Sequence, residues 1–361
     1  MARPGKGQRY LEHGLMAGDT DRLAGVDVAR GVAMLGMFVS HVGPDKGSAG
    51  SWLWVFDGRS SALFASLAGV GIGLLASRPG PPGMAMSLGG LRFRLAVRGM
   101  VVAVIGLLLL YLGTPVAVIL PSYGVMFVLV LPLVGMPAPK LLAAGAIALT
   151  AGSLLVLALR QWVTGEAGAT WPATAEALLF AWKYPALAWV GYVLTGMALG
   201  ALLRDRPGGT ARVMLLSGVA VAVASYGASA LAGTLWAFDV ESWPGVLLSP
   251  VPHSTSPLEM LGNAGVAAAV LASSMLLLPG HRAGPLAPVA AIGSMPLTIY
   301  TGHIIAIAAL GDDVVRNPLS PLPLLGIMFG AAVFATVWRT AFGAGPLEQL
   351  VRLSAAGARR G

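Results

Sequence analysis

Three ionisable side chains stand in the apolar stretch 25–43: Asp27, Arg30 and His41. Charged groups are rare within membrane-spanning helices and usually mark function, because hydrocarbon does not solvate them. On an α-helix, Asp27 and Arg30 can pair because they are three positions apart. Arg30 and His41 lie within about 20° of one face and about 16 Å apart along the axis. The spacing predicts a one-sided polar stripe facing a reaction chamber, with His41, Arg30 and Asp27 as catalytic candidates.

His41 is the sharpest of these candidates, because histidine exchanges protons near neutral pH. It can act as the general base on a hydroxyl or an amine. The alternative is a histidine that ends its helix at the level of the lipid head groups. Arg30 also has two interpretations. Its guanidinium matches the geometry of a phosphate and can hold an anionic ligand from the cytosol, whereas a buried pair with Asp27 would only fix helix packing.

A basic segment contains Arg92, Arg94 and Arg98. Together with Arg30, these residues are candidates for binding an anionic ligand from the cytosol. The alternative is membrane topology, since Lys and Arg accumulate in cytoplasmic loops.

Further polar side chains are expected on the outer side of the membrane. Tyr300 and His303 point the same way because they are three positions apart on one helix. The predicted site residues on this side are Asp57, Arg59, His253, Glu259, Tyr300 and His303. Helix capping, surface pairing and packing inside the bundle are the structural alternatives.

No metal site is predicted. His41, His253 and His303 are suitable zinc ligands by type, but their spacing matches no zinc motif. The chain has no cysteine, which excludes disulfides, thiolate nucleophiles and cysteine-bound metals.

The elements that position these residues are predicted to be membrane helices. Of the 361 residues, 56% are hydrophobic and 11% are charged, and the mean hydropathy is +0.79. Soluble domains carry about 25% charged residues. The net charge of +8 is spread over short loops rather than gathered on one soluble face, so it indicates membrane topology and not nucleic-acid binding.

We expect an all-α, polytopic membrane bundle of about ten helices, each crossing about 30 Å of hydrocarbon. Their approximate limits are 25–43, 60–77, 95–113, 116–134, 140–159, 184–203, 212–234, 258–278, 288–310 and 322–342. The Lys and Arg residues expected on the outer side are Lys46, Arg59, Arg160, Lys183 and Arg316. The other basic residues, apart from Arg30, fall on the inner side, which places both termini in the cytoplasm. The chain is therefore divided into a cytoplasmic tail (1–24), a membrane bundle (25–342) and a second cytoplasmic tail (343–361).

Small residues recur at four-residue spacing in two of these helices, as Ala65/Gly69/Gly73 and Gly196/Gly200. This spacing is typical of tightly packed membrane helices. The glycines follow no predicted strand, so they do not indicate a dinucleotide-binding loop.

Four segments of the chain resemble a known superfamily, the transmembrane acyltransferases. Residues 22–38, from Arg22-Leu to Gly-Met-Phe38, resemble the first helix of the YeiB-like and heparan-α-glucosaminide N-acetyltransferase-like families. Residues 57–64, 293–300 and 345–348 resemble the YeiB-like branch. The resemblance implies an acyltransferase-like bundle.

The resemblance also bears on the catalytic histidine. The spacing from Arg30 to His41 is similar to the arginine-to-histidine motif of the bacterial O-acyltransferases. In the glucosaminide enzymes the catalytic histidine follows this helix. The corresponding residues of this chain, 52–56, include no histidine. The role therefore falls on His41 through the O-acyltransferase motif.

The expected function is an integral-membrane acyltransferase of the cell (inner or plasma) membrane. It would move an acyl group, expected to be acetyl, from cytosolic acyl-CoA to a hydroxyl or amine of an acceptor on the outer side. The phosphates of this donor are expected to bind Arg30, Arg92, Arg94 and Arg98, and the acceptor is expected to bind Asp57, Arg59, His253, Glu259, Tyr300 and His303. His41 would act as general base or carry the acyl group itself. The acceptor is left open between a glycan, a lipid-linked sugar and a metabolite. Membrane lipid is a further partner, nucleic acid is not, and a homodimer is compatible with the sequence.

Two other functions remain open. A proton- or anion-coupled transporter would use the polar stripe as a relay, and it should show paired broken helices in two related halves. A non-catalytic membrane scaffold would leave Asp27, Arg30 and His41 without a reason to be buried together.

Overall fold

The structure is a computed structural model that describes residues 23–42, 51–77, 87–163, 177–181, 183–205, 207–235, 242–278, 283–315, 317 and 320–357. Within these ranges every regular element is a helix and none is a β-strand. The predicted all-α class is confirmed.

The bounds of the helices follow the predicted apolar stretches, with several shorter helices between them. In chain order the elements are α2 (Ala24–His41), η1 (Ser51–Phe56), α3 (Arg59–Ala76), α4 (Leu88–Leu110), α5 (Leu120–Val130), η2 (Leu131–Leu133), α6 (Ala138–Ile147), η3 (Ala148–Gly152), α7 (Ser153–Val163), η4 (Ala177–Ala181), α8 (Ala186–Asp205), α9 (Pro207–Leu235), α10 (Trp243–Leu248), α11 (Pro257–Leu277), η5 (Gly284–Leu286), α12 (Ala287–Ser294), α13 (Pro296–Leu310), α14 (Asp312–Val315), α15 (Leu322–Phe342) and α16 (Pro346–Gly357).

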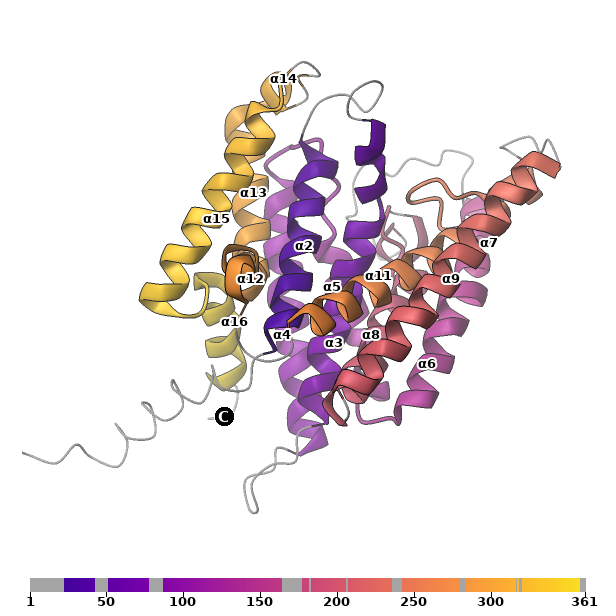
Figure 1. The fold of residues 1–361 in the computed structure, drawn as a ribbon, viewed down its shortest axis with the longest axis horizontal. Helices are drawn as coiled ribbons and strands as arrows, with labels where there is room; N and C mark the ends of the chain where they lie inside the picture. The colour runs from indigo at the N-terminus through magenta and orange to yellow at the C-terminus, as the bar shows by residue number, and fades with distance from the viewer. Residues whose placement is uncertain are drawn as a thin grey trace, which may run out of the picture.

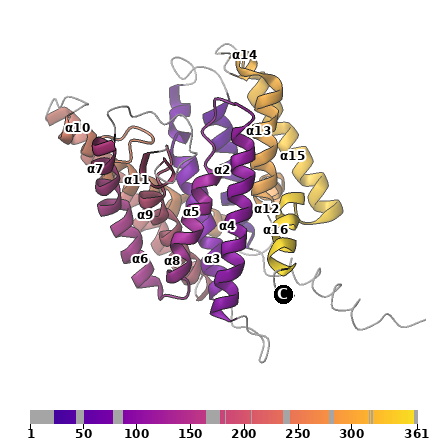
Figure 2. The ribbon, with the colours of Figure 1, turned by 180° about the vertical axis from the view of Figure 1, so that it is seen from behind.

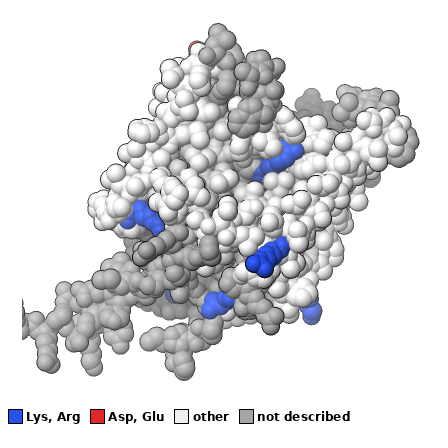
Figure 3. Space-filling model, viewed as in Figure 1, with Lys and Arg blue, Asp and Glu red and all other residues white. Residues whose placement is uncertain are grey.

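The helices form one bundle. Figure 1 shows α13 and α15 along one flank and α6, α7 and α9 along the other, with α2 between them. Seen from behind, α4 and α16 lie close to α13 (Figure 2). The described surface in Figure 3 is largely neither acidic nor basic, and its Lys and Arg side chains form separate patches. Such a surface suits contact with lipid.

Seven helices of the described chain are long and apolar enough to cross a membrane, or eight if the bent pair of α12 and α13 is one span. This supports a multi-pass membrane protein. Two further helices occupy predicted positions without reaching these limits. Helix α2 contains Asp27, Arg30 and His41, which lower its hydropathy, and α5 is only 11 residues long. The number of crossings and the side of each terminus stay predictions.

The predicted small-residue seams are confirmed as the contact between α3 and α8. A side chain added at Gly69 or Gly73 would overlap the backbone of 193–197 on α8. One added at Gly196 or Gly200 would overlap the backbone of 66–70 on α3. The backbones approach so closely because glycine has no side chain to separate them.

Helix α2 crosses α12 in the same manner. A Cβ added at Gly31 would overlap the carbonyl of Val289, and one added at Gly293 would overlap the carbonyl of Asp27. Around this crossing Ala33 and Phe38 of α2 are fully buried. The crossing holds the polar stripe of α2 inside the bundle.

The prediction of a single helix over 288–310 is wrong. The chain breaks at Met295, and α12 and α13 meet at an angle of 77°. The cause is Pro296, which lacks a backbone N–H and disfavours the helical conformation of the residue before it. The described residues contain one such bent pair, whereas a carrier built from two related halves should contain two.

The segment predicted as a C-terminal tail contains helix α16, which packs beside α4 and α13 (Figure 2). Pro346 stands at its first turn, where proline is favourable. Its apolar side chains are too few for a membrane span, but Leu347 packs against the core and Val351 is buried. Residues 346–357 are therefore part of the bundle.

Candidate functional site

A cavity of about 740 Å³ lies between the N-terminal part of α2 and helices α3, α4, α13 and α16. Its volume falls in the range of about 300–1,000 Å³ typical of sites for small molecules. The charged side chains that line it are Asp27, Arg30, Arg98, Arg204, Glu348 and Arg352. We call it the cationic cavity, because its arginines outnumber its carboxylates.

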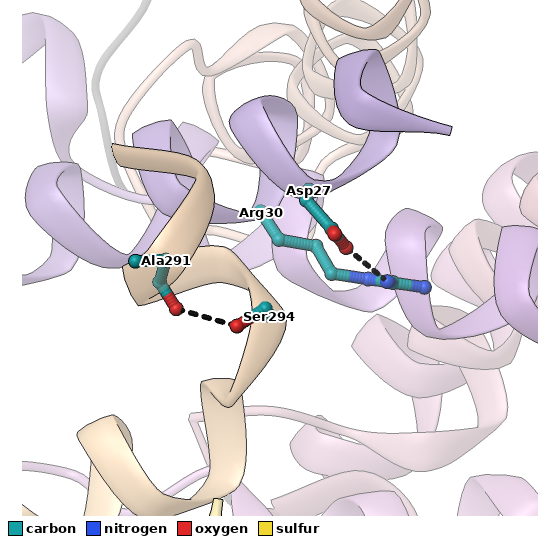
Figure 4. Close-up of polar contacts among 4 residues, drawn as sticks. All are labelled: Asp27, Arg30, Ala291 and Ser294. Atoms are coloured by element: carbon teal, nitrogen blue, oxygen red, sulfur yellow. Dashed lines mark hydrogen bonds and ion pairs between the residues drawn. The ribbon is translucent and has the colours of Figure 1, made fainter. Parts of the chain in front are cut away.

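Arg30 and Asp27 form the predicted pair on α2. The Arg30 Nη1 donates to Asp27 Oδ1 at 3.3 Å, and Asp27 is buried. Figure 4 shows the Arg30 side chain extended toward Asp27, with Ser294 at the end of α12 near it. Arg30 and Ser294 both line the cavity. The space for this side chain comes from Gly71 of α3, where a Cβ would lie 3.1 Å from Arg30 Nη2. Both interpretations of Arg30 remain compatible with this geometry, because its side chain pairs with Asp27 and also lines the cavity.

The three predicted arginines of α4 have different surroundings. Arg98 lines the cationic cavity and lies over the ring of Phe127, 5.8 Å from its centroid. Arg92 instead donates to the carbonyls of Pro132 and Val134, at 3.1 and 3.3 Å. Neither Arg92 nor Arg94 belongs to the described lining. The structure therefore brings Arg98 together with Arg30 and separates Arg92 from them.

Three charged groups of the cavity escaped prediction as site residues. Arg204 ends α8 and donates to the carbonyl of Leu74 at 3.2 Å. Arg352 and Glu348 come from α16. The sequence placed both arginines in segments expected on the cytoplasmic side. Positive-inside topology explained that placement as well as a binding role did. For Glu348 it was the segment 345–348, which resembled the YeiB-like branch.

Glu348 holds the start of α13. Its carboxylate accepts hydrogen bonds from the backbone N–H groups of Leu297 and Thr298, at 2.7 and 3.2 Å. It also accepts one from the Thr298 hydroxyl at 2.6 Å. The first N–H groups of a helix have no partner within the helix, and negative charge is favourable there. Glu348 therefore stabilises the broken end of α13 at the wall of the cavity.

His41 lies at the other end of α2, beside a second histidine. The His41 Nδ1 is 3.1 Å from His303 Nε2, and the rings are stacked with centroids 5.3 Å apart. One nitrogen donates and the other accepts, and the tautomer decides which. Phe38 packs against His303 at 5.0 Å. His303 is buried, whereas His41 is partly exposed.

Aromatic side chains connect the cationic cavity with the histidine pair. Phe64 and Tyr123 line the cavity, and Phe64 stacks on Tyr300 at 6.3 Å. Tyr300 meets His303 edge to face at 4.9 Å, and its hydroxyl accepts from the N–H of Ile119. His41 is not part of the described cavity lining. The cationic cavity thus contains Asp27 and Arg30 of the predicted polar stripe and not His41.

Glu259, a predicted acceptor-binding residue, organises the loop before α11. Its carboxylate accepts from the backbone N–H groups of His253 and Thr255, at 2.7 and 2.8 Å. It also accepts from Ser254 Oγ at 3.0 Å and from Asn263 Nδ2 at 3.2 Å. His253 and Thr255 both have φ of 64°, a left-handed conformation that is uncommon for residues other than glycine. The hydrogen bonds to Glu259 hold this conformation.

Arg59 lies beside the same network. Its guanidinium stacks on the rings of Trp54 and Tyr226, 4.8 and 4.6 Å from their centroids. The Tyr226 hydroxyl donates to Asn263 Oδ1 at 2.7 Å, which links it to the partner of Glu259. Asp57 precedes this arginine in the turn before α3, and its carbonyl accepts from the Arg59 N–H at 2.7 Å. Asp57 and Arg59 do not line either of the two cavities described here.

His253 is enclosed by aromatic rings. It stacks on Trp189 with 5.9 Å between centroids and meets Tyr184 edge to face at 5.2 Å. Burial, with a smaller effect of the positive charge of Lys183, lowers the pKa of His253 to about 3. Burial likewise raises the pKa of Tyr184 to about 12. His253 is therefore neutral at physiological pH and lies apart from the His41–His303 pair.

A shared metal site is not formed by the part of the chain that the structure describes. No group of three His, Asp or Glu side chains there is close enough to hold a metal ion. The three candidate zinc ligands are divided between two places, with His253 against Trp189 and the other two histidines on α2 and α13.

The fold defines a polytopic membrane protein with a cavity rich in arginine at one end of helix α2. Comparison with protein families adds a more particular finding. The profile of the heparan-alpha-glucosaminide N-acetyltransferase catalytic domain matches residues 22–232. The chain belongs to this family of membrane acetyltransferases. A second profile, that of a protein family of unknown function (DUF418, YeiB-like), matches residues 205–358. Searches of curated proteins and of solved structures found no match.

Proposed function

We propose that the protein transfers an acetyl group from cytosolic acetyl-CoA to a hydroxyl or amine of an acceptor on the outer side of the cell membrane. One observation carries this proposal. One end of α2 borders a cavity with four arginines, and the other end carries a histidine pair. The family supports acetyl transfer, and the geometry supports a donor site and a reaction centre on one helix.

The cationic cavity suits the phosphates of the donor. Arginine binds phosphate through two parallel hydrogen bonds, which a lysine cannot reproduce. Asp27 and Glu348 already accept hydrogen bonds from Arg30 and from the start of α13. Their charges are therefore partly compensated, and Arg98, Arg204 and Arg352 add positive charge to the lining. Acetyl-CoA would bind with its phosphates among these groups and its thioester directed along α2.

The reaction needs one base near the acceptor. The acceptor oxygen or nitrogen attacks the thioester carbon, a new C–O or C–N bond forms, and the C–S bond breaks. His41 takes the proton of the acceptor and returns it to the leaving thiolate of CoA. The His303 ring fixes the orientation of His41 through the hydrogen bond at 3.1 Å. An acyl-histidine at His41 is the alternative route to the same products.

The thioester must pass the aromatic contact between Phe64 and Tyr300 to reach His41. These rings join the cavity to the histidine pair. The proposal therefore includes a rotation of Phe64 or Tyr300 when the donor binds.

The test is turnover by the purified protein. Radiolabelled acetyl-CoA is incubated with the wild type and with His41→Ala, in the presence of membrane lipid and cell-wall extracts as sources of acceptor. We expect release of CoA by the wild type and a loss of about 10²–10⁴-fold in rate for His41→Ala, the usual contribution of a general base. Equal release by both proteins, or no release with any acceptor, contradicts the proposal.

A further inference from the structure

A second cavity, of about 860 Å³, lies between α13 and α15 on the flank of the bundle. Figures 1 and 2 both show these two helices side by side at the edge of the molecule. Most of its lining is apolar, with Ile299, Ala306 and Leu310 on α13 and with Ile327 and Phe334 on α15. We call it the lateral groove.

The lateral groove is open toward lipid. Gly302, Gly326 and Gly330 line it, and all three are exposed. A Cβ added at any of them would meet no atom within 4 Å. Helix α15 beside it presents large apolar side chains outward, with Leu322 exposed to 72% and Phe329 to 73%. An aliphatic chain of a lipid can therefore enter from the bilayer between α13 and α15.

The groove has the length and polarity of one lipid. Its lining covers 298–310 of α13 and 322–334 of α15, which at 1.5 Å per residue is about 18 Å. Half of the hydrocarbon core is about 15 Å. Asp313, Asn317 and Ser320 line one end, next to α14. Hydrogen-bonding groups at one end, and a wall along the rest that is apolar except for Thr298 and His303, fit a head group and its aliphatic chain.

His303 connects the groove to the proposed reaction centre. It lines the groove, is only 3% exposed, and its Nε2 lies 3.1 Å from His41. Its Nδ1 is buried and has no hydrogen-bond partner among the described residues. Helix α13 separates the two cavities, with Leu297 on the cationic cavity and Thr298 on the groove. Donor and acceptor would thus approach the histidines from opposite sides of α13.

We infer that the lateral groove admits a membrane lipid as the acyl acceptor, one with a long aliphatic chain and an uncharged head group that bears hydroxyls. This inference rests on the proposed function and names its acceptor class. The carboxylate of Asp313 accepts hydrogen bonds from hydroxyls and disfavours a phosphate close to it. The aliphatic chain of the lipid gains no hydrophobic free energy by moving from the bilayer into the groove. Contacts with the head group therefore decide which lipid binds. The hydroxyl oxygen attacks the thioester, an ester forms, CoA leaves, and His41 carries the proton to the thiolate.

The test uses the full-length protein in phosphatidylcholine vesicles. The vesicles contain a glycosyl diacylglycerol that carries a diazirine in one acyl chain. Photo-crosslinked peptides are mapped, and transfer of radiolabelled acetyl from acetyl-CoA into the lipid fraction is measured in parallel. The groove variant is Gly326→Leu with Gly330→Leu, which fills space in the groove and leaves His41 and His303 in the sequence. The matched control is Gly227→Leu with Gly233→Leu on α9, where the glycines also meet no atom within 4 Å.

We expect crosslinks in 298–310 and 322–334, reduced about tenfold in the groove variant and unchanged in the control, which corresponds to about 1.4 kcal/mol of binding free energy. Labelled lipid should fall in parallel. Crosslinks as frequent on α9 as in the groove, or a labelled product that is water-soluble and insensitive to the groove variant, overturn the inference. Crosslinks that respond to the groove variant without any acetyl transfer support the lipid site and contradict the proposed function instead.

Discussion

Arg98 and Arg92 lie on the same helix, α4, and carry the same charge, but the structure gives them different tasks. Arg98 lines the cationic cavity, and Arg92 caps the carbonyls of Pro132 and Val134. Replacing each by glutamine removes one positive charge from the same region. We expect Arg98→Gln to weaken binding of acetyl-CoA and Arg92→Gln to weaken the fold.

The magnitudes follow from the contacts. A hydrogen bond between a charged donor and acceptor contributes about 1.5–3 kcal/mol, so losing one phosphate contact of Arg98 should raise Kd about 10- to 150-fold. Arg98→Gln loses the contact with the Phe127 ring but also removes one of the like charges that share the cavity with Arg30, so we expect little net change in stability. Arg92→Gln loses two hydrogen bonds to carbonyls, about 1–3 kcal/mol of unfolding free energy, and leaves the cavity intact.

The assay is a titration of the purified proteins with acetyl-CoA by calorimetry, with thermal unfolding measured on the same samples. Added salt should lower the affinity for acetyl-CoA more in the wild type than in Arg98→Gln, because the variant has one fewer positive charge for salt to screen. An Arg98→Gln protein that is stable and binds acetyl-CoA as tightly as the wild type would refute the assignment of the donor site. The same conclusion follows if Arg92→Gln loses as much affinity as Arg98→Gln.

Three further predictions concern stability. Glu259→Ala should lower the free energy of unfolding by about 3 kcal/mol or more, because it leaves the buried N–H of Thr255 and other donors without their acceptor; thermal unfolding measures this. Stability should fall as the pH drops from 6.5 toward 3, because His253 has its pKa lowered to about 3 and takes up its proton more readily in the unfolded chain. The loss is about 3 kcal/mol by pH 4.5, and His253→Phe should remove this contribution. Gly293→Val should cost about 1–3 kcal/mol by forcing α2 and α12 apart, whereas Gly227→Val, in open space, should not.

Each of these predictions has an outcome that contradicts it. A Glu259→Ala protein as stable as the wild type would mean that the loop 253–255 holds its own conformation. If the stability of His253→Phe depends on pH as that of the wild type does, groups other than His253 cause the loss of stability in acid. Equal stability of Gly293→Val and Gly227→Val would show that the crossing of α2 and α12 is not tightly packed.

Much of the fold could be predicted from local patterns. A chain in lipid must satisfy its backbone hydrogen bonds within each segment, so long apolar stretches predicted the places of the long helices. Their ends differ by up to seven residues, as at the start of α4. Small residues at four-residue spacing predicted the packing of α3 on α8. The break at Met295 was missed, although the Met-Pro pair was visible, because proline is also tolerated within membrane helices. Helix α16 was missed because a short amphipathic helix resembles a soluble tail in composition.

The candidate site was predictable only in its local part. Asp27 and Arg30 are three positions apart, so helical geometry alone predicted their pair. Arg92 and Arg98 share a basic segment, but whether a long side chain turns toward a cavity or toward a carbonyl depends on the neighbouring helix. For the same reason the sequence could not tell that Glu259 holds a loop while Arg352 lines the cavity.

By itself the sequence determined the class of the protein, its helices and the polar stripe of α2, because hydropathy and helical periodicity act over short distances along the chain. The tertiary structure decided which charges share a cavity and which histidines meet. His41 and His303 are 262 positions apart, and their contact depends on the bend at Met295 and on the crossing of α2 with α12. Such contacts arise from the packing of distant segments, which no local pattern encodes.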